Sequence, residues 1–353
     1  MMTGQALATR FLETADFIGA KLCRDAIWSG QRCNWFGVPI LETQRAHAIE
    51  AQSVCGSDFY LGTSGIAVFL ARLFHATGEK IFRMTAEGAI RQALSRLDHF
   101  PRDLRKDFCK GLTGVAYSLS EIAESCGIDK FNDMALLILE DVGRDPEPNS
   151  SCDPATVTAL LRMHHRYQSD FLLRMAIECG QDIRSRTNVD VGAAMLELFK
   201  ATGETTYRQA AEAVLVKVDD ESELLQTARG YVRAFETLGD DAYAVRAREA
   251  LELIRTRIDS LTDDVDFSFP TGLAAAGDLL LEANRVLGNE DLRRTAERAG
   301  NWGIDRYKQD DLPWPCGSKT GWDAPSFMNG LAGIGYFYLR LHDPSHVPSI
   351  IFS

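Results

Sequence analysis

The hydrophobic positions of this chain recur with the spacing of α-helices. Segments such as GIAVFLARLFHATGE (65–79), GVAYSLSEIAESCG (114–127) and AAGDLLLEANRVLGNE (275–290) place apolar residues at i, i+3, i+4 and i+7. The two-residue alternation that is typical of strands is nearly absent. The pattern therefore predicts an all-α protein.

Each apolar segment is followed by a helical segment that is more charged. Examples are IFRMTAEGAIRQALSRL (81–97), TYRQAAEAVLVKV (206–218) and AYAVRAREALELIRTRI (242–258). The apolar segments are hydrophobic on all sides, as buried helices are, whereas the charged segments carry Arg and Glu on one face. The pairs predict helical hairpins with a buried inner helix and an exposed outer helix.

These hairpins repeat along the chain. The inner helices are expected to start near Gly65, Gly114, Ala155, Asp190, Gly230, Ala275 and Gly333. No outer helix follows the seventh inner helix, but an amphipathic segment, ALATRFLETADFIGAKLCRDAI (6–27), precedes the first. If the two ends pair, the array closes and no repeat needs a polar cap. We therefore expect one domain over residues 1–353, an α/α toroid of about seven inner and seven outer helices, in which the N-terminal helix closes the ring with the C-terminal inner helix.

The composition limits which classes of partner the protein is expected to bind. The 353 residues carry a net charge of −12, which argues against a broad basic face for nucleic acid or anionic membranes. The chain has no run of 18 apolar residues and no signal-peptide pattern at its N-terminus, so we expect no membrane insertion and a cytoplasmic location. Its eight cysteines form no CxxC pair and are expected to be reduced thiols.

Several motifs resemble the lanthionine synthetase C-like (LanC-like) family. These are GTSG (62–65), GLTG (111–114), GLAG (330–333), NWFGVPI (34–40) and the run from Trp314 to Phe352, WPCGSKTGWDAPSFMNGLAGIGYFYLRLHDPSHVPSIIF. The resemblance covers nearly the whole chain and is strongest to the cyclase domain of class II lanthipeptide synthetases. It implies an α/α barrel of seven inner and seven outer helices. It also implies addition of a peptide Cys thiol to dehydroalanine or dehydrobutyrine, with zinc holding the thiol as thiolate.

The same resemblance locates the positions of the zinc ligands, which in the family are a Cys at one helix entry and an adjacent Cys-His at the next. SFPTGLAA (268–275) stands where the family has Ser-Leu-Cys-His-Gly-Leu-Ala-Gly, which places Pro270 and Thr271 at two ligand positions. LLQTARGYVRA (224–234) aligns through Gly230 and places Leu225 at the third. All three ligands are substituted, so we expect no metal and no cofactor.

Candidates for catalysis are few. The family's His falls at Arg186 or, with a short gap, at Asn188, and the Asp expected before the third inner helix is near Asp153, although the best spacing gives Pro148. Cys316 is a further candidate, but a reactive thiol requires a lowered pKa, and a structural Cys is the simpler interpretation.

Four residues are candidate contacts for a peptide substrate: Lys319, Trp322, Asp323 and Arg229. The first three share the loop of Cys316, where a packed Trp and solvated charges are the simpler interpretation. Cys109 in DFCKGLTG imitates a Cys-His-Gly entry, with Lys110 in place of His, but is expected to be a buried structural Cys.

These observations favour a zinc-free LanC-like protein in the maturation of a lanthipeptide-type peptide. It would bind a precursor peptide or a peptide-modifying enzyme as a degenerate cyclase or accessory protein. One alternative is an active zinc-independent cyclase that relies on orientation and helix dipoles. A second is a glycan-acting α/α toroid, which needs two carboxylates facing the cavity; Asp153, Asp190 and Asp266 lie near helix entries, where Asp also serves as an N-cap. Whether the protein is an enzyme is left open.

Overall fold

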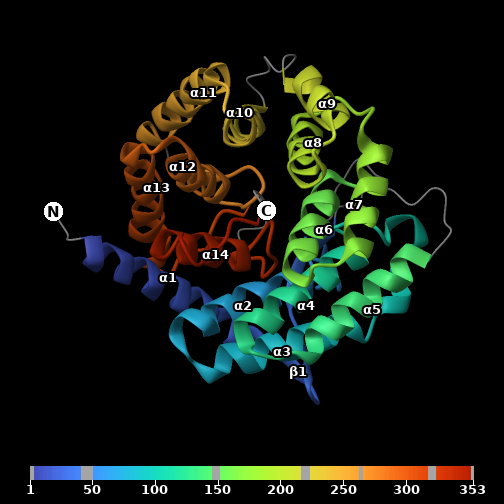
Figure 1. The fold of residues 1–353 in the computed structure, drawn as a ribbon. Helices are drawn as coiled ribbons and strands as arrows, with labels where there is room; N and C mark the ends of the chain where they lie inside the picture. Colours follow the sequence, from blue (N-terminus) through green and yellow to red (C-terminus); the bar gives the residue numbers. More distant parts are fainter. Residues whose placement is uncertain are drawn as a thin grey trace.

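The computed structural model describes residues 4–40, 51–144, 152–215, 223–261, 265–316 and 323–350. Over these ranges it contains fourteen α-helices arranged as a two-layered ring (Figure 1). The predicted α/α toroid is therefore confirmed. The inner layer comprises α2 (Thr63–Thr77), α4 (Leu112–Cys126), α6 (Pro154–Tyr167), α8 (Val189–Thr202), α10 (Leu224–Leu238), α12 (Leu273–Leu287) and α14 (Leu331–His342).

The outer layer follows the same order. It comprises α1 (Gly4–Asp25), α3 (Lys80–Leu94), α5 (Lys130–Arg144), α7 (Asp170–Ile183), α9 (Thr205–Leu215), α11 (Asp241–Asp259) and α13 (Glu290–Gly303). Each inner helix from α2 to α12 packs against the outer helix that follows it, while α14 packs against α1. Every inner helix also contacts its two inner neighbours, including α14 with α2, so the inner ring is closed. That residues 1–353 form a single domain stays a prediction.

Burial follows the hydrophobic pattern. All residues of α14 from Leu331 to Leu341 are buried, whereas α13 buries one face and exposes its charged residues. No described helix has both the length and the apolar character required to cross a membrane.

Four short strands interrupt the helical pattern after α1. They form two antiparallel hairpins, β1 (Ile27–Ser29) with β2 (Arg32–Asn34) and β3 (Phe36–Ile40) with β4 (Ala51–Val54). The fully buried Trp35 between them anchors the hairpins, because its indole Nε1 donates to the Leu22 carbonyl at 2.7 Å. The NWFGVPI motif (34–40) thus comprises the last residue of β2, Trp35 and the whole of β3.

The entries to four inner helices share the pattern Phe-x-x-Gly-x-x-Gly. It starts at Phe59 before α2, Phe108 before α4 and Phe327 before α14, and at Phe269 before α12, where Ala275 replaces the last Gly. A Cβ added at Gly65, Gly114 or Gly333 would lie closer than 3.0 Å to the carbonyl oxygen of the Phe six residues earlier. Glycine is required here because the entry segment folds back onto the first helical turn.

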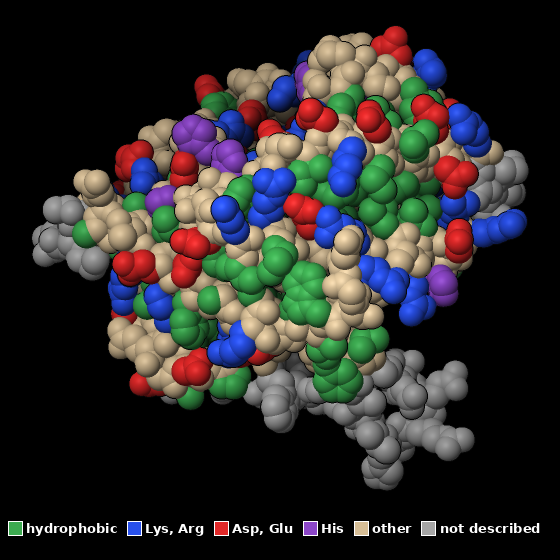
Figure 2. Space-filling view, turned by 90° about the horizontal axis from the view of Figure 1, so that it is seen from below, with side chains coloured by type: hydrophobic (Ala, Val, Ile, Leu, Met, Phe, Trp, Pro, Cys, Tyr) green, Lys and Arg blue, Asp and Glu red, His purple; other side chains and the backbone are tan. Residues whose placement is uncertain are grey.

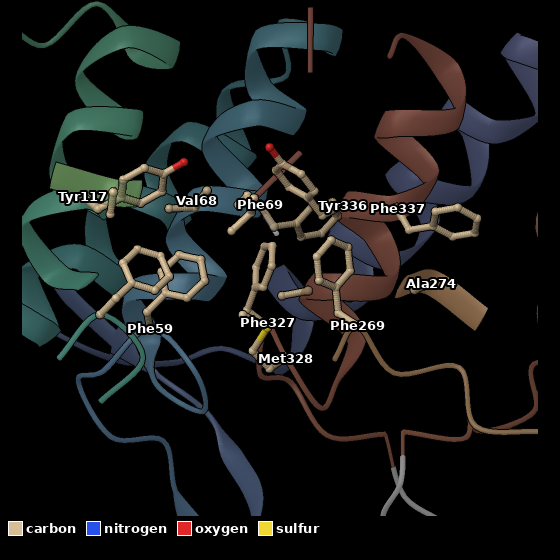
Figure 3. Packing of buried hydrophobic residues seen from close by; sticks show 14 of the residues in the cluster. Phe59, Val68, Phe69, Tyr117, Phe269, Ala274, Phe327, Met328, Tyr336 and Phe337 are labelled. Atoms are coloured by element: carbon tan, nitrogen blue, oxygen red, sulfur yellow. The ribbon is translucent and has the colours of Figure 1, made fainter. Parts of the chain in front are cut away.

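Backbone hydrogen bonds join these four entries side by side. Tyr60 N donates to Cys109 O at 3.0 Å, Met328 N to Tyr60 O at 3.1 Å, and Phe269 N to Met328 O at 3.0 Å. The Phe side chains pack in the same order, with ring centroids 4.8–5.2 Å apart. Figure 3 shows Phe59, Phe327 and Phe269 lying in a row. The entries from α4 through α2 and α14 to α12 therefore form one rigid wall.

The opposite ends of the inner helices are joined by ion pairs between neighbours. Each of these ion pairs connects two adjacent inner helices: Arg72 with Glu121, Arg166 with Glu121, Arg233 with Glu197, Arg285 with Glu236, and Arg340 with Asp278 and Glu282. Partly or fully buried pairs of this kind specify which helices are neighbours.

One cysteine expectation is wrong. Cys152, just before α6, forms a disulfide with Cys179 of α7, whereas all eight cysteines were expected to be reduced. The spacing of 27 residues carried no pairing signal in the sequence, because only the hairpin brings the two Cα atoms to 5.5 Å.

Candidate functional site

A cavity of about 300 Å³ lies at the N-terminal ends of the inner helices. Apolar and aromatic side chains dominate its wall, among them Tyr60, Phe108, Tyr117 and Met328. Its polar groups include Cys109, Asp153, Thr158, Asp190, Gln226, Arg229 and Thr271. Few polar groups on a largely apolar wall are typical of a ligand-binding cavity.

The C-terminal segment contributes to this cavity from within the ring. Ile350 lines it, and the C-terminus lies near the centre of the ring in Figure 1. Tyr336 Oη donates to Pro348 O at 2.6 Å, and Arg340 Nη1 donates to Val347 O at 2.6 Å. These bonds fix the segment that precedes Ile350 against α14.

Cys109 takes the position after the Phe in the entry to α4. The equivalent residues in the other three entries are Tyr60, Pro270 and Met328, and all four line the cavity. Cys109 was expected to be a buried structural Cys, but the residue is partly exposed and lines the cavity. The repeated Phe-x-x-Gly pattern was the signal that could have placed it there.

Asp107, Cys109 and Asp153 bring one ligand atom each to within 4.8 Å of one another. Such a group could in principle hold a metal ion. However, Asp107 Oδ1 accepts the Lys110 N–H at 2.6 Å, and Asp153 Oδ1 accepts the Thr156 N–H at 2.7 Å. Local turns therefore account for both carboxylates without a metal ion.

The surroundings of Cys109 disfavour the thiolate form of its side chain. Burial, followed by the negative charges of Asp153 and Asp107, raises the pKa of the Cys109 thiol far above its ordinary value. Burial and the nearby Asp153 raise the pKa of Asp107 to about 6. The Cys109 thiol therefore stays protonated at neutral pH.

The comparisons with known proteins agree with this geometry. The family model for lanthionine synthetase C-like proteins matches residues 53–193 and 227–352, which is more than half of the chain. The chain belongs to the LanC-like family. No protein with a curated description matches the LanC-like chain by sequence at a significant level.

Solved structures show the same fold. A nisin cyclase superposes with a TM-score of 0.61 and 12% identity, over 83% of this LanC-like chain and 90% of the cyclase. An α-1,6-mannanase from Salegentibacter sp. HEL1_6 superposes with a TM-score of 0.50 and 9% identity, over 94% of this chain and 100% of the mannanase. At these identities the likenesses show a shared α/α toroid.

The positions that the resemblance assigns to zinc ligands are occupied by Pro270, Thr271 and Leu225. Pro270 and Thr271 both line the cavity at the entry to α12, whereas Leu225 does not line it and its neighbour Gln226 does. Pro270 and Leu225 offer no side-chain donor, and the neutral Thr271 hydroxyl lies 3.3 Å from Asp266 Oδ2. Zinc in proteins is bound by Cys, His and carboxylate ligands, so the residues at these positions do not fit it.

Two predicted site residues face the cavity of this LanC-like chain. Asp153 is the N-cap of α6 and lines the wall beside Cys109. Arg229 also lines the wall, where its Nη2 lies 3.0 Å from Asp190 Oδ1. The structure therefore brings Asp153 and the Asp190–Arg229 ion pair into one cavity, although Asp153 and Asp190 come from different repeats.

The remaining predicted residues lie elsewhere. Arg186 donates to Cys152 O at 2.9 Å and pairs with Asp182, outside the lining of the cavity. Cys316 is buried with its Sγ 3.1 Å from Trp314 O, and burial followed by Asp323 raises the pKa of its thiol.

Asp323 also lies away from the cavity. It accepts the Trp314 N–H at 2.7 Å and forms an ion pair with Lys21 of α1. Lys319 and Trp322 lie outside the described residues, so their contacts with a peptide stay a prediction.

Proposed function

We propose that this LanC-like protein binds a precursor peptide of the lanthipeptide type in its central cavity without zinc, as a degenerate cyclase or accessory protein. The observation that carries the proposal is the chemistry at the family's ligand positions. Leu225, Pro270 and Thr271 replace every side chain that would hold the metal, while the cavity itself is retained. A retained cavity without metal ligands favours binding over bond formation.

The cavity wall supports a peptide as the ligand. The Asp190–Arg229 ion pair can hydrogen-bond to backbone amides or polar side chains, and Tyr60, Tyr117 and Phe108 offer aromatic surface to apolar side chains. A cavity of about 300 Å³ accommodates a few side chains of a peptide whose remainder lies outside.

Thioether formation without zinc is the second candidate, because Asp153 and Arg229 face the cavity and could orient or protonate a substrate. The environment of Cys109 argues against it. Burial and adjacent carboxylates hold the pKa of this thiol high, and a substrate thiol placed beside it would experience the same field. Without a metal ion, little nucleophilic thiolate would form there.

A glycan-acting enzyme receives less support. Inactive variants of the structurally similar mannanase carry substitutions at two consecutive aspartates. Among the described lining residues of this cavity, no two carboxylates are consecutive, and Asp190 is already paired with Arg229. The shared toroid fold therefore does not imply that this protein shares the chemistry of the mannanase.

A synthetic peptide that contains one dehydroalanine and one Cys tests the proposal. We expect fluorescence anisotropy to show binding, and the free-thiol count to fall no faster than in a protein-free control. Arg229→Ala should weaken binding about fivefold or more through loss of a partly buried polar anchor, whereas Arg294→Ala on the exposed surface of α13 should leave it unchanged. Faster thiol loss would establish a zinc-independent cyclase, and absence of binding would overturn the proposal.

A further inference from the structure

A second depression, of about 380 Å³, lies outside the central cavity and is named here the basic groove. It runs between the segment that leaves β4 and the segment that connects the end of α3 to the 3₁₀ turn Leu97–His99. The residues that matter for its chemistry are Val54, Asp58, Arg96, His99, Phe100 and Lys110.

The basic groove and the central cavity share a wall. Lys110 follows Cys109 in the entry to α4, and Asp58 precedes Tyr60 by two residues in the entry to α2. Cys109 and Tyr60 line the central cavity and are joined by the backbone hydrogen bond of 3.0 Å. A peptide that occupies the cavity can therefore continue over this wall into the groove without a long unsupported span.

The groove is basic although the chain as a whole carries a charge of −12. Arg96 and Lys110 are exposed, and neither forms an ion pair with any carboxylate of the described chain. Arg96 Nη1 lies 3.5 Å from the ring of His99. Among the described residues that line the groove, Asp58 alone is acidic, and its Oδ1 accepts the Leu61 N–H at 2.8 Å. These cations are positioned to meet negative charge from outside the protein.

One side of the groove is apolar and exposed. Val54 is 58% exposed, and its cross-strand partner Phe36 is 56% exposed. Because the two residues face each other directly in the β3–β4 hairpin, their side chains project from the same face of the sheet. Figure 2 shows the underside of the molecule as it stands in Figure 1, with hydrophobic side chains exposed beside basic ones.

We propose that the basic groove binds an extended acidic segment of the same peptide whose other part enters the central cavity. This inference rests on the proposed function and adds a second contact site to it. An extended peptide points alternate side chains to opposite sides, so carboxylates can meet Arg96 and Lys110 while apolar side chains pack on Val54 and Phe36. The recognised class is a segment in which Asp or Glu alternates with apolar residues.

Two labelled peptides test this, one of alternating Glu and Leu and one of alternating Gln and Leu. The full-length protein should bind the Glu-Leu peptide about tenfold tighter at low salt, and added salt should remove most of the difference. The double variant Arg96→Glu/Lys110→Glu should lose about tenfold in affinity for the Glu-Leu peptide. The control Arg144→Glu/Arg294→Glu changes the net charge equally at side chains that are 75% and 68% exposed, and should bind as the unaltered protein does.

Equal binding of the two peptides, or equal losses in both double variants, would overturn the inference. So would displacement of the Glu-Leu peptide by millimolar inorganic phosphate, since that marks a general anion site. These failures are distinguishable from failure of the proposed function. If binding of the dehydroalanine-containing peptide still depends on Arg229, the proposal for the central cavity stands. If that peptide does not bind at all, the proposal for the cavity fails.

Discussion

At the scale of the residue, the repeated entry pattern determines what the cavity presents. The position after each Phe faces inward, and the chain fills it with Tyr60, Cys109, Pro270 and Met328 at four different helices. The fold fixes the backbone, while these side chains set the chemistry. Because glycine and phenylalanine maintain this backbone pattern, the side chains at these positions can change without loss of the cavity.

The glycines that end the entry motif should tolerate no side chain. Gly333→Ala would press a Cβ against the Phe327 carbonyl and Phe269, and should lower the free energy of unfolding by about 1–3 kcal/mol. Gly4→Ala, where nothing lies within 4 Å, is the matched control. Urea unfolding measures both variants. Equal stability of Gly333→Ala and the unaltered protein would contradict the close approach.

The raised pKa of Cys109 predicts slow alkylation at neutral pH despite its place on the cavity wall. Asp153→Asn removes a negative charge beside the thiol, which should lower its pKa and speed its reaction with iodoacetamide. Asp190→Asn, a cavity carboxylate paired with Arg229, should have less effect. Mass spectrometry of the peptide that contains Cys109 gives the rates. An unchanged rate in Asp153→Asn would show that the carboxylate does not govern the thiol.

At the scale of the element, two kinds of interaction hold neighbouring inner helices together. Backbone hydrogen bonds and packed Phe rings join the entries of four inner helices, and ion pairs join neighbouring inner helices at their other ends. Glu121 of α4 is fully buried and pairs with both Arg72 of α2 and Arg166 of α6. Three consecutive inner helices therefore share one carboxylate.

The stability contributed by Glu121 should depend on pH. Burial alone would raise its pKa, but Arg72, Arg162 and Arg166 outweigh burial and lower the pKa to about 2 from an ordinary 4.5. A lowered carboxyl pKa stabilises the fold above pH 4.5, and this contribution is lost as the pH falls toward 2. Glu121→Gln should cost about 3 kcal/mol at neutral pH, because it removes the buried carboxylate that Arg72 and Arg166 share and leaves them only the half-exposed Glu124.

The difference between Glu121→Gln and the unaltered protein should narrow when unfolding is measured at pH values below the ordinary pKa of 4.5. Glu140→Gln removes an exposed i,i+4 pair with Arg144 and should change stability by less than about 0.5 kcal/mol at any pH. A cost for Glu121→Gln that stays constant over this pH range would contradict the assigned ion pair.

At the scale of the whole molecule, the ring closes through chain segments that are far apart in sequence. The outer helix α1 packs on α14, the last inner helix, and α14 packs on α2. His342 Nδ1 lies 3.0 Å from Ala8 O, and Phe11 is buried between Gly300 and Tyr338. The N-terminal helix is thus a structural part of the toroid.

Removal of the Phe11 side chain should weaken the whole ring. Phe11→Ala should destabilise the protein by about 3–5 kcal/mol, the usual cost of a large buried cavity. Leu137→Ala, at a side chain 63% exposed on α5, should cost less than about 0.5 kcal/mol. Chemical unfolding followed by circular dichroism and by Trp fluorescence should shift together. A shift in only one signal would show that α1 detaches by itself.

Much of this architecture could be predicted from the sequence because it is periodic. The seven inner helices start within a few residues of the expected positions, except that α10 begins at Leu224, one and a half turns before Gly230. The β1–β2 hairpin was missed because its strands, Ile27–Ser29 and Arg32–Asn34, are three residues each, too short to show alternation. The cavity position of Cys109 and the disulfide of Cys152 depend on contacts between repeats, which spacing along one chain does not reveal.

The central claim is that the toroid binds its peptide without zinc, and zinc stoichiometry tests it most directly. Protein purified with added zinc should contain far less than one equivalent by elemental mass spectrometry, and a chelator should leave peptide binding unchanged. One tightly held equivalent, together with loss of binding after chelation, would contradict the account. If that zinc were lost in Cys109→Ser, the metal would lie with Asp107 and Asp153 rather than at the family's positions.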